Sequence, residues 1–253
     1  MYCNILIVQV HLLIGTILNK TLSITCIDAY TYEPTIQALL KTEETLHHAG
    51  IRVSKVYWFS DIPMPENAAQ RLQFLNIDVQ WTKIKRFKRY TDEYNFITLK
   101  LVPHIAVEDF NLIIHADGFA INADAWTDEF LNYDYIGARW PNGGVGNGGF
   151  CLRSRKLYDA MLSMDIGYES INYDLGDSRY YVIDGKGDKV VPEDNIICKI
   201  YRDELQEVYD IKFATNEIAD RFSIEHNMGS PWLGKSLGFH GKHGVAKHYG
   251  VDL

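Results

Sequence analysis

The stretch Asn111–Phe119, NLIIHADGF, is a short apolar run that leads directly into two side chains able to bind a metal ion. Residues 112–114 are Leu-Ile-Ile, and an apolar run ended by a turn signal is typical of a buried strand in a parallel sheet. Ligands of α/β proteins collect at the carboxyl ends of such strands. His115 and Asp117 follow the strand at that end, so we expect them to share one metal ion or one metal-bound phosphate.

Strand and helix patterns on the N-terminal side of this stretch predict a larger α/β fold. Residues 21–27 and 51–59 are β-rich and flank a helical pattern that starts near Pro34. Strand, helix and strand of these lengths form a βαβ unit. With a further strand expected at 79–84, we predict an α/β fold. It would be a single domain over residues 21–253, with a mostly parallel central sheet flanked by helices and a Rossmann-like nucleotide-binding half.

Shorter patterns predict where several other elements begin and end. Thr91 is a plausible N-cap of a helix that Pro103 would end, and residues 126–131 have the spacing of a short amphipathic helix. Ser154 is expected to cap the next helix. Two β-rich segments within 181–191 flank a Gly- and Asp-rich turn and therefore predict a hairpin.

Charge and cysteine content exclude several classes of protein. The 253 residues carry a formal net charge of −8, which argues against nucleic acid as a partner because phosphate backbones require a basic face. A nucleotide stays compatible with this charge, since a divalent metal can offset its phosphates. The four cysteines are far apart and form no C-x-x-C pair, so neither a zinc knuckle nor a disulfide scaffold is indicated.

An apolar extension occupies residues 1–20, and its run from 5 to 18 is too short for a membrane-spanning helix of about twenty residues. It lacks the basic start and clear cleavage site of a signal peptide. Three interpretations stay open: an extra element packed on the domain, a membrane-surface anchor, or an upstream translation artefact. We expect a cytoplasmic protein, membrane-associated if the second interpretation holds.

Three polar residues follow the first two predicted strands. Asp28, Tyr30 and Asp61 lie where a nucleotide base or ribose hydroxyl would be bound, so we assign them to the nucleotide. The alternative is that the two aspartates only form turns. The nearby basic run Lys83–Arg89 is either a solvated face or a set of charges that faces a pyrophosphate.

The glycine-rich segment Val145–Arg155, VGNGGFCLRSR, allows close approach of a ligand to the backbone. It lacks the G-K-[ST] ending of a P-loop and does not fit the G-x-G-x-x-G fingerprint. We interpret it as a loop that lines a pocket through Gly148 and Gly149, followed by a short strand. A flexible surface loop is the alternative.

Two further candidates lie later in the chain. Glu193 and Asp194 open a predicted helix, where the exposed backbone N–H groups stabilise acidic side chains. Either carboxylate could instead act as a general base beside the glycine loop. Gly238 and Gly241 flank the pair Phe239-His240, so His240 is expected on a turn. It is either a solvated loop histidine or a metal ligand.

Taken together, these stretches resemble a glycosyltransferase-like family of the GT-A type. Members show a strand ending in x-x-Asp, a YDYxGAxW stretch, a VGNGGFSLRS loop, a Glu-Asp pair, a Phe-x-x-Glu and a late Gly-x-His. The order matches over roughly residues 21–243. Here these motifs are His115-Ala116-Asp117, Tyr133–Trp140 (YDYIGARW), Val145–Ser154 (VGNGGFCLRS), Glu193-Asp194, Phe222–Glu225 and Gly238-Phe239-His240.

The resemblance implies a nucleotide-diphosphate-sugar donor, a UDP-sugar before others, and Mn²⁺ or Mg²⁺. It assigns the metal to Asp117, His240 and His115, and it places Ala116 in the donor-binding segment. His115 departs from the usual first Asp of a D-x-D motif, and added imidazole suits manganese or softer ions. Glu193 or Asp194 would be the base of an inverting transfer.

We therefore expect a metal-dependent glycosyltransferase that moves a sugar to a hydroxyl of a glycan or other acceptor. Two other functions stay open. A non-catalytic nucleotide-sugar or glycan-binding domain of the same fold would bind the donor without turnover, and the histidine at the first motif position favours it. A metal-dependent phosphohydrolase would use Asp117 and the late histidines on simple phosphate esters.

Overall fold

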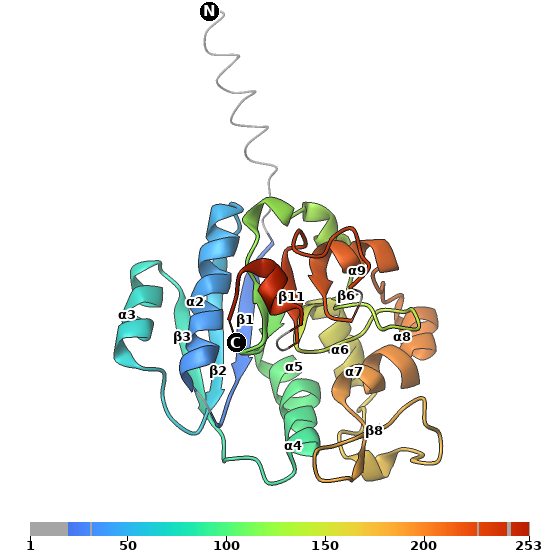
Figure 1. The fold of residues 1–253 in the computed structure, drawn as a ribbon. Coiled ribbons are helices and arrows are strands. Elements are labelled where there is room, and N and C mark those ends of the chain that lie inside the picture. Colours follow the sequence, from blue (N-terminus) through green and yellow to red (C-terminus); the bar gives the residue numbers. More distant parts are fainter. Residues whose placement is uncertain (1–19, 31, 227, 242–243, 253) are drawn as a thin grey trace, which may run out of the picture.

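The computed structural model describes residues 20–30, 32–226, 228–241 and 244–252, which form a central sheet with helices packed on it (Figure 1). Except for Lys20, the predicted N-terminal extension lies outside the described residues. The sheet has six strands in the order β3-β2-β1-β4-β7-β6. Their bounds are β1 (Leu22–Ile27), β2 (Val53–Ser60), β3 (Asp78–Lys83), β4 (Phe110–Ile114), β6 (Tyr135–Ile136) and β7 (Phe150–Ser154).

The direction of the strands gives a mostly parallel sheet, as predicted. β1 runs parallel to β2 and β4, and β2 runs parallel to β3. β7 is antiparallel to both β4 and β6. Every residue of β1 and β4 is buried, which explains their near-continuous apolar sequences. The α/β fold class predicted from the sequence is therefore confirmed.

Helices cover this sheet and connect its strands (Figure 1). The helix predicted near Pro34 is present, and Gly50, with φ of 77°, follows its end. The helix between β2 and β3 was not predicted. The α-helices are α2 (Tyr32–His48), α3 (Glu66–Phe74), α4 (Tyr90–Phe96), α5 (Val102–Ile105), α6 (Arg155–Ser163), α7 (Glu193–Asn195), α8 (Arg202–Tyr209) and α9 (Asn216–Phe222).

Two of the predicted helix ends are wrong. α4 begins at Tyr90 after Arg89, so Thr91 lies inside the helix and does not cap it. Pro103 does not end the helix, because a π-helical turn at Ile97–Leu101 joins α4 to α5, with the proline in the first turn of α5. A proline near a helix start is tolerated, since the N–H it lacks has no partner there.

Other local predictions agree more closely with the structure. Ser154 caps α6, and its Oγ accepts a hydrogen bond from Leu157 N at 3.0 Å. The hairpin consists of β8 (Val182–Ile183) and β9 (Lys189–Val190). The helix expected at 126–131 is a 3-10 helix at Asp128–Asn132. None of the helices in the described part of the chain is long and apolar enough to cross a membrane.

A small second sheet places the late histidine beside the central sheet. β5 (Gly118–Ala120) pairs antiparallel with β11 (Gly238–His240), which also pairs with β10 (Ser223–Ile224). His240 lies directly opposite Gly118. The prediction that His240 lies on a turn is therefore wrong: the residue is on a strand, where a Cβ on Gly238 would lie only 2.3 Å from the carbonyl oxygen of Phe119.

Candidate active site

A tight turn carries the first two residues of the site away from the central sheet. His115 N donates to Gly118 O at 2.9 Å, and Gly118 N donates to His115 O at 3.1 Å, with Ala116 and Asp117 at the tip. The turn joins β4 to β5, and β5 pairs with β11. Two strands that are distant in sequence therefore bring His240 to the same place as His115 and Asp117.

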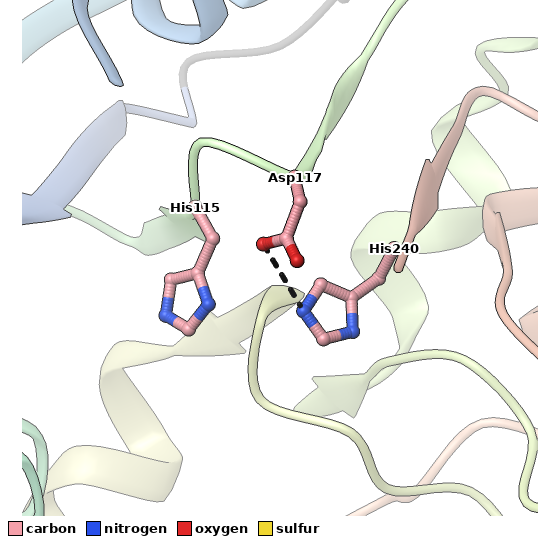
Figure 2. A group of neighbouring side chains, drawn as sticks. All are labelled: His115, Asp117 and His240. Atoms are coloured by element: carbon pink, nitrogen blue, oxygen red, sulfur yellow. Dashed lines mark ion pairs between the residues drawn. The ribbon is translucent and has the colours of Figure 1, made fainter. Parts of the chain in front are cut away.

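These three side chains converge on one point (Figure 2). One ligand atom from each of His115, Asp117 and His240 lies within 4.8 Å of the others. His240 Nε2 is 3.8 Å from Asp117 Oδ1, and the two imidazole ring centroids are 5.6 Å apart. We call these three residues the HDH cluster.

Each imidazole of the HDH cluster has a partner on its outer nitrogen. Tyr94 Oη lies 2.6 Å from His115 Nε2, and Glu225 Oε1 lies 3.2 Å from His240 Nδ1. In the tautomers in which these outer nitrogens carry the proton, His115 Nδ1 and His240 Nε2 offer lone pairs to the cluster. Metal-binding histidines are commonly oriented by outer hydrogen bonds of this kind.

The two imidazoles have opposite shifts in pKa. Removal of the His115 ring from water, followed by the charge of His240, lowers the pKa of His115 to about 4. Burial on its own lowers the pKa of His240, but the hydrogen bond and charge of Glu225, together with Asp117, raise it overall. His115 is therefore neutral at pH 7, whereas the negative charges around His240 favour its protonated form.

The glycines of the predicted pocket loop pack against the site so closely that no side chain fits. A Cβ on Gly149 would lie 2.0 Å from His240 Nε2, and one on Gly148 would lie 1.6 Å from Glu193 Oε1. A Cβ on Gly118 would lie 2.5 Å from His240 Cδ2. The loop that carries Gly148 and Gly149 thus runs between the HDH cluster and the carboxylates of α7.

Those two carboxylates have different surroundings. Glu193 is buried and accepts a hydrogen bond from Arg153 Nη2 at 3.1 Å. Asp194 is half-buried, and its Oδ2 accepts from Asn147 N at 3.1 Å. Burial, with the adjacent Asp194, raises the pKa of Glu193 to about 7 against the opposing charge of Arg153. Burial also raises the pKa of Asp194.

Two cavities meet at the HDH cluster. The first, of about 510 Å³, is lined by Glu193 and Asp194 together with His115 and His240. The second, of about 980 Å³, is lined by all three cluster residues and by part of α2. Tyr90 lines both. His115 and His240 therefore line both cavities, whereas Asp117 lines the second cavity alone.

The residues assigned to the nucleotide lie at the start of α2 and the end of β2. Asp28 accepts hydrogen bonds from Tyr30 N at 2.7 Å and from the hydroxyl of Thr35. Asp61 accepts from the hydroxyl of Tyr32. The contact with Tyr30 N is that expected of a turn-forming aspartate, whereas the contacts with Thr35 and Tyr32 tie the two strand ends to α2. Their assignment to the nucleotide stays a prediction.

The basic run is placed beside a different cavity. Side chains from it line a space of about 600 Å³ next to α4, together with Phe96 and Tyr168. Arg86 lies over the Tyr30 ring, with its guanidinium carbon 5.0 Å from the ring centroid. The lining residues of the run are Lys83, Ile84, Lys85, Phe87, Lys88 and Arg89.

Three polar residues that contact the site were not predicted as site residues. Tyr94 lies within the helix predicted between Thr91 and Pro103, and its contact with His115 depends on where α4 lies relative to the turn after β4. Arg153 and Asn147 lie within the glycine-loop motif, whose charged and amide side chains could have identified them. Asn147 Nδ2 also donates to Glu225, so Asn147 links the support of His240 to Asp194.

Comparison with known proteins gives a family and a fold. A family model described as "Protein of unknown function (DUF5672)" matches residues 77–240, and the chain belongs to this family. No curated protein matches the chain.

Solved structures of a glycosyltransferase have a similar fold. The apo-form glycosyltransferase GlyE of Streptococcus pneumoniae TIGR4 has a TM-score of 0.53 at 16% identity, over 88% of this chain and 54% of that chain. A second GlyE structure from the same organism has a TM-score of 0.49 at 15% identity over the same shares. The chain thus spans about half the length of these proteins. At such identity the first likeness establishes a glycosyltransferase-like fold.

Proposed function

We propose that this member of the DUF5672 family is a metal-dependent glycosyltransferase that moves a sugar from a nucleotide diphosphate to a hydroxyl of a glycan or other acceptor. The observation that supports it is the HDH cluster, whose two histidines line two cavities, one of which is also lined by a pair of carboxylates. Such a transfer needs a donor space, an acceptor space, a cation for the diphosphate and a base for the hydroxyl.

The residues of the HDH cluster fit a divalent cation. Asp117 and His240 would hold it, with His115 as a third donor; one carboxylate and two imidazoles suit Mn²⁺ among the ions that bind diphosphates. Neighbouring ligands of one octahedral ion lie about 3 Å apart when each bond is about 2.1 Å. The ligand atoms lie within 4.8 Å of one another, so they need to approach by up to about 2 Å. The bound ion would neutralise the diphosphate and stabilise the leaving group.

The larger cavity is the better space for the donor. Its volume of about 980 Å³ lies at the upper end of the range for small-molecule sites, about 300–1,000 Å³. Lys41 and Gln37 of α2 line it and would contact phosphate and sugar hydroxyls. A UDP-sugar is the first donor to test.

The smaller cavity would hold the acceptor. Aromatic side chains line it, namely Tyr90, Trp140 and Tyr181, and flat rings of this kind pack against the apolar faces of sugars. Polar groups on the same lining, including Lys199, can bind hydroxyls. The acceptor hydroxyl would then lie between the cluster and the carboxylates.

Asp194 is the better candidate for the base. Its half-buried carboxylate lines the acceptor cavity and is fixed by backbone N–H groups of Asn147 and Asn195. Glu193 instead pairs with Arg153 and is buried under Gly148. In this mechanism Asp194 takes the proton of the attacking hydroxyl, whose oxygen bonds to the anomeric carbon as the bond to the nucleotide diphosphate breaks, so the sugar is transferred with inverted configuration. Glu193 keeps the start of α7 in position.

The test is a thermal-shift panel of UDP-, GDP- and dTDP-sugars with and without Mn²⁺, followed by a transfer assay. A ligand at about 100 times its dissociation constant adds roughly 2.7 kcal/mol to the free energy of unfolding. We expect stabilisation by one nucleotide class only when Mn²⁺ is present, and turnover with a suitable glycan. Donor binding without transfer or hydrolysis would indicate a binding domain, and release of phosphate from simple esters would indicate a phosphohydrolase.

A further inference from the structure

A groove beside α4 contains the basic run of the sequence, which has no role in the transfer described above. Five of the seven residues in Lys83–Arg89 are basic, in a chain whose formal net charge is −8. Side chains of this run line a space of about 600 Å³, a volume within the range of about 300–1,000 Å³ for small-molecule sites. We call this space the basic groove.

The positive charges of the basic groove are mostly free, whereas its negative charges are engaged. Asp92 forms an ion pair with Arg89 at 2.7 Å and accepts hydrogen bonds from Ser170. Glu93 Oε2 accepts from the backbone N–H groups of Lys88 and Arg89. The exposed lysines of the groove that form no ion pair within the described part of the chain are Lys83, Lys85 and Lys88. An anion in the groove would therefore meet ammonium groups that no carboxylate neutralises.

Aromatic and aliphatic side chains complete the lining of the basic groove. Phe96 is 38% exposed, and its ring packs edge-on to the Tyr168 ring with centroids 5.0 Å apart. Flat rings of this kind can pack against the apolar faces of sugars, while ammonium groups attract negatively charged substituents. The other apolar lining residues are Ile84, Phe87, Ile97 and Leu101. The groove thus offers both kinds of contact that a charged sugar chain needs.

The basic groove and the smaller cavity at the HDH cluster lie on two faces of α4. Tyr90 and Tyr94 line the smaller cavity, whereas Glu93 and Phe96 line the groove. Phe87 of the groove packs edge-on to Tyr90, with ring centroids 5.5 Å apart. A chain that leaves the smaller cavity past Tyr90 would therefore reach the groove within one ring contact.

The β8–β9 hairpin borders the same two spaces. Val182 of β8 lines the smaller cavity, and Lys186 Nζ in the hairpin turn donates to Lys88 O at 3.0 Å. Figure 1 shows α4 and β8 at the same end of the molecule. The hairpin therefore brings one more positive charge to the basic run and joins the edge of the groove to the edge of the cavity.

We propose that the basic groove binds a negatively charged stretch of a sugar chain whose end lies in the smaller cavity, so that the acceptor is an anionic glycan. This inference rests on the proposed function and specifies its acceptor. An acidic peptide could satisfy the lysines alone, but a sugar chain also uses the exposed ring of Phe96 and continues into the aromatic lining of the smaller cavity.

The experiment measures binding of short chains to the whole protein by isothermal titration calorimetry, without donor or metal. The probes are a hexamer of galacturonic acid, uncharged maltohexaose and a peptide of six glutamates, which matches the charge of the first probe. We expect the galacturonate hexamer to bind at least about tenfold more tightly than maltohexaose, because several exposed ion pairs each add a small gain. It should also bind more tightly than the peptide.

Two double variants with the same change in net charge locate the binding site. Lys85→Gln with Lys88→Gln removes two free charges of the groove, and we expect the affinity for the galacturonate hexamer to fall about fivefold or more. The control is Lys212→Gln with Lys235→Gln, at exposed lysines that line none of the three cavities, and it should stay within about twofold.

A third variant tests the aromatic contact. Phe96→Ala should weaken binding of the galacturonate hexamer by about threefold, because an exposed ring is lost from the groove. All of the substituted side chains are exposed, so each variant should fold.

Three results would overturn the proposal: equal losses in the two double variants, equal binding of maltohexaose and the galacturonate hexamer, or tighter binding of the glutamate peptide than of the hexamer. Each of these leaves transfer to an uncharged acceptor possible. Absence of transfer with every donor, metal and acceptor would overturn the proposed function instead, and the binding data would then describe a glycan-binding groove alone.

Discussion

The HDH cluster and the carboxylate pair of α7 lie on opposite sides of the glycine loop, and their side chains are supported in opposite ways. Around the cluster, outer hydrogen bonds to Tyr94 and Glu225 orient two imidazoles so that lone pairs face one point. Around the pair, burial makes negative charge costly and raises the pKa of both Glu193 and Asp194. One region is therefore suited to receive a cation and the other to receive a proton.

Loss of the proton acceptor should have the largest effect on rate. Asp194→Asn keeps the shape of the side chain and its contact with Asn147 N, but it cannot take a proton. We expect kcat to fall by about 10²–10⁴ while Mn²⁺-dependent binding of the donor is unchanged. Initial rates and donor titrations measure both. Asp203→Asn, at an exposed position of α8, is the control, and equal losses in both variants would contradict the role of Asp194.

The corresponding change in the HDH cluster should weaken the binding of Mn²⁺. Asp117→Asn removes the only carboxylate of the cluster, so we expect Mn²⁺ affinity to fall by more than about 100-fold, beyond the 10–100-fold typical of outer residues. Calorimetric titration with Mn²⁺ measures it, with exposed Asp124→Asn as the control. The contrast between the two regions would fail if Asp117→Asn lowered kcat alone and left the affinity for Mn²⁺ intact.

The buried carboxylate of Glu193 should make stability depend on pH. Its pKa is raised from 4.5 to about 7, so the folded protein binds this proton more tightly than the unfolded chain. The stability it contributes is complete below about pH 4.5 and is lost as pH rises through about 7, by up to about 3 kcal/mol.

Urea unfolding at pH 5 and pH 8, with a chelator present, measures this contribution as the difference between wild type and Glu193→Gln. The variant leaves the buried Arg153 without its carboxylate partner, so it should be less stable at both pH values. The gap should be smaller at pH 8. A gap that is the same at both would show that Glu193 does not titrate with a raised pKa.

The smallest of these effects concerns an outer residue of the cluster. Glu225→Gln keeps a hydrogen-bonding group beside His240 Nδ1 but removes the negative charge that raises the pKa of this histidine. Loss of an outer partner typically costs 10–100-fold in metal affinity, and a Gln substitution should lie at the lower end. Titration with Mn²⁺ measures it, with exposed Glu204→Gln on α8 as the control. Unchanged affinity would remove Glu225 from the support of the site.

Much of the centre of the sheet could be predicted because β1 and β4 are buried on both faces. Their sequences are therefore continuous apolar runs, as in Leu112-Ile113-Ile114, and the turns that end them carry polar residues. The π-helical turn before Pro103 could not be predicted in this way. It depends on how α4 packs on the sheet, and no local signal distinguishes it from an ordinary helix end.

Only part of the candidate site could be predicted from the sequence, for a related reason. His115 and Asp117 are neighbours in sequence, but their meeting with His240 depends on the pairing of β5 with β11, a contact between residues more than 100 positions apart. Glycines on both sides of His240 suggested a turn, whereas Gly238 is required by the close approach of β5. Tyr94 was missed because a helical pattern does not show which neighbour a hydroxyl contacts.

The most direct test of the account is an anomalous difference map from crystals of the whole chain soaked with Mn²⁺ and UDP, recorded at the manganese edge. The account predicts one strong peak about 2.2 Å from Asp117, His240 Nε2 and His115 Nδ1, beside the two cavities that the histidines line. A manganese peak elsewhere in the molecule, with these three side chains free of metal, would contradict it.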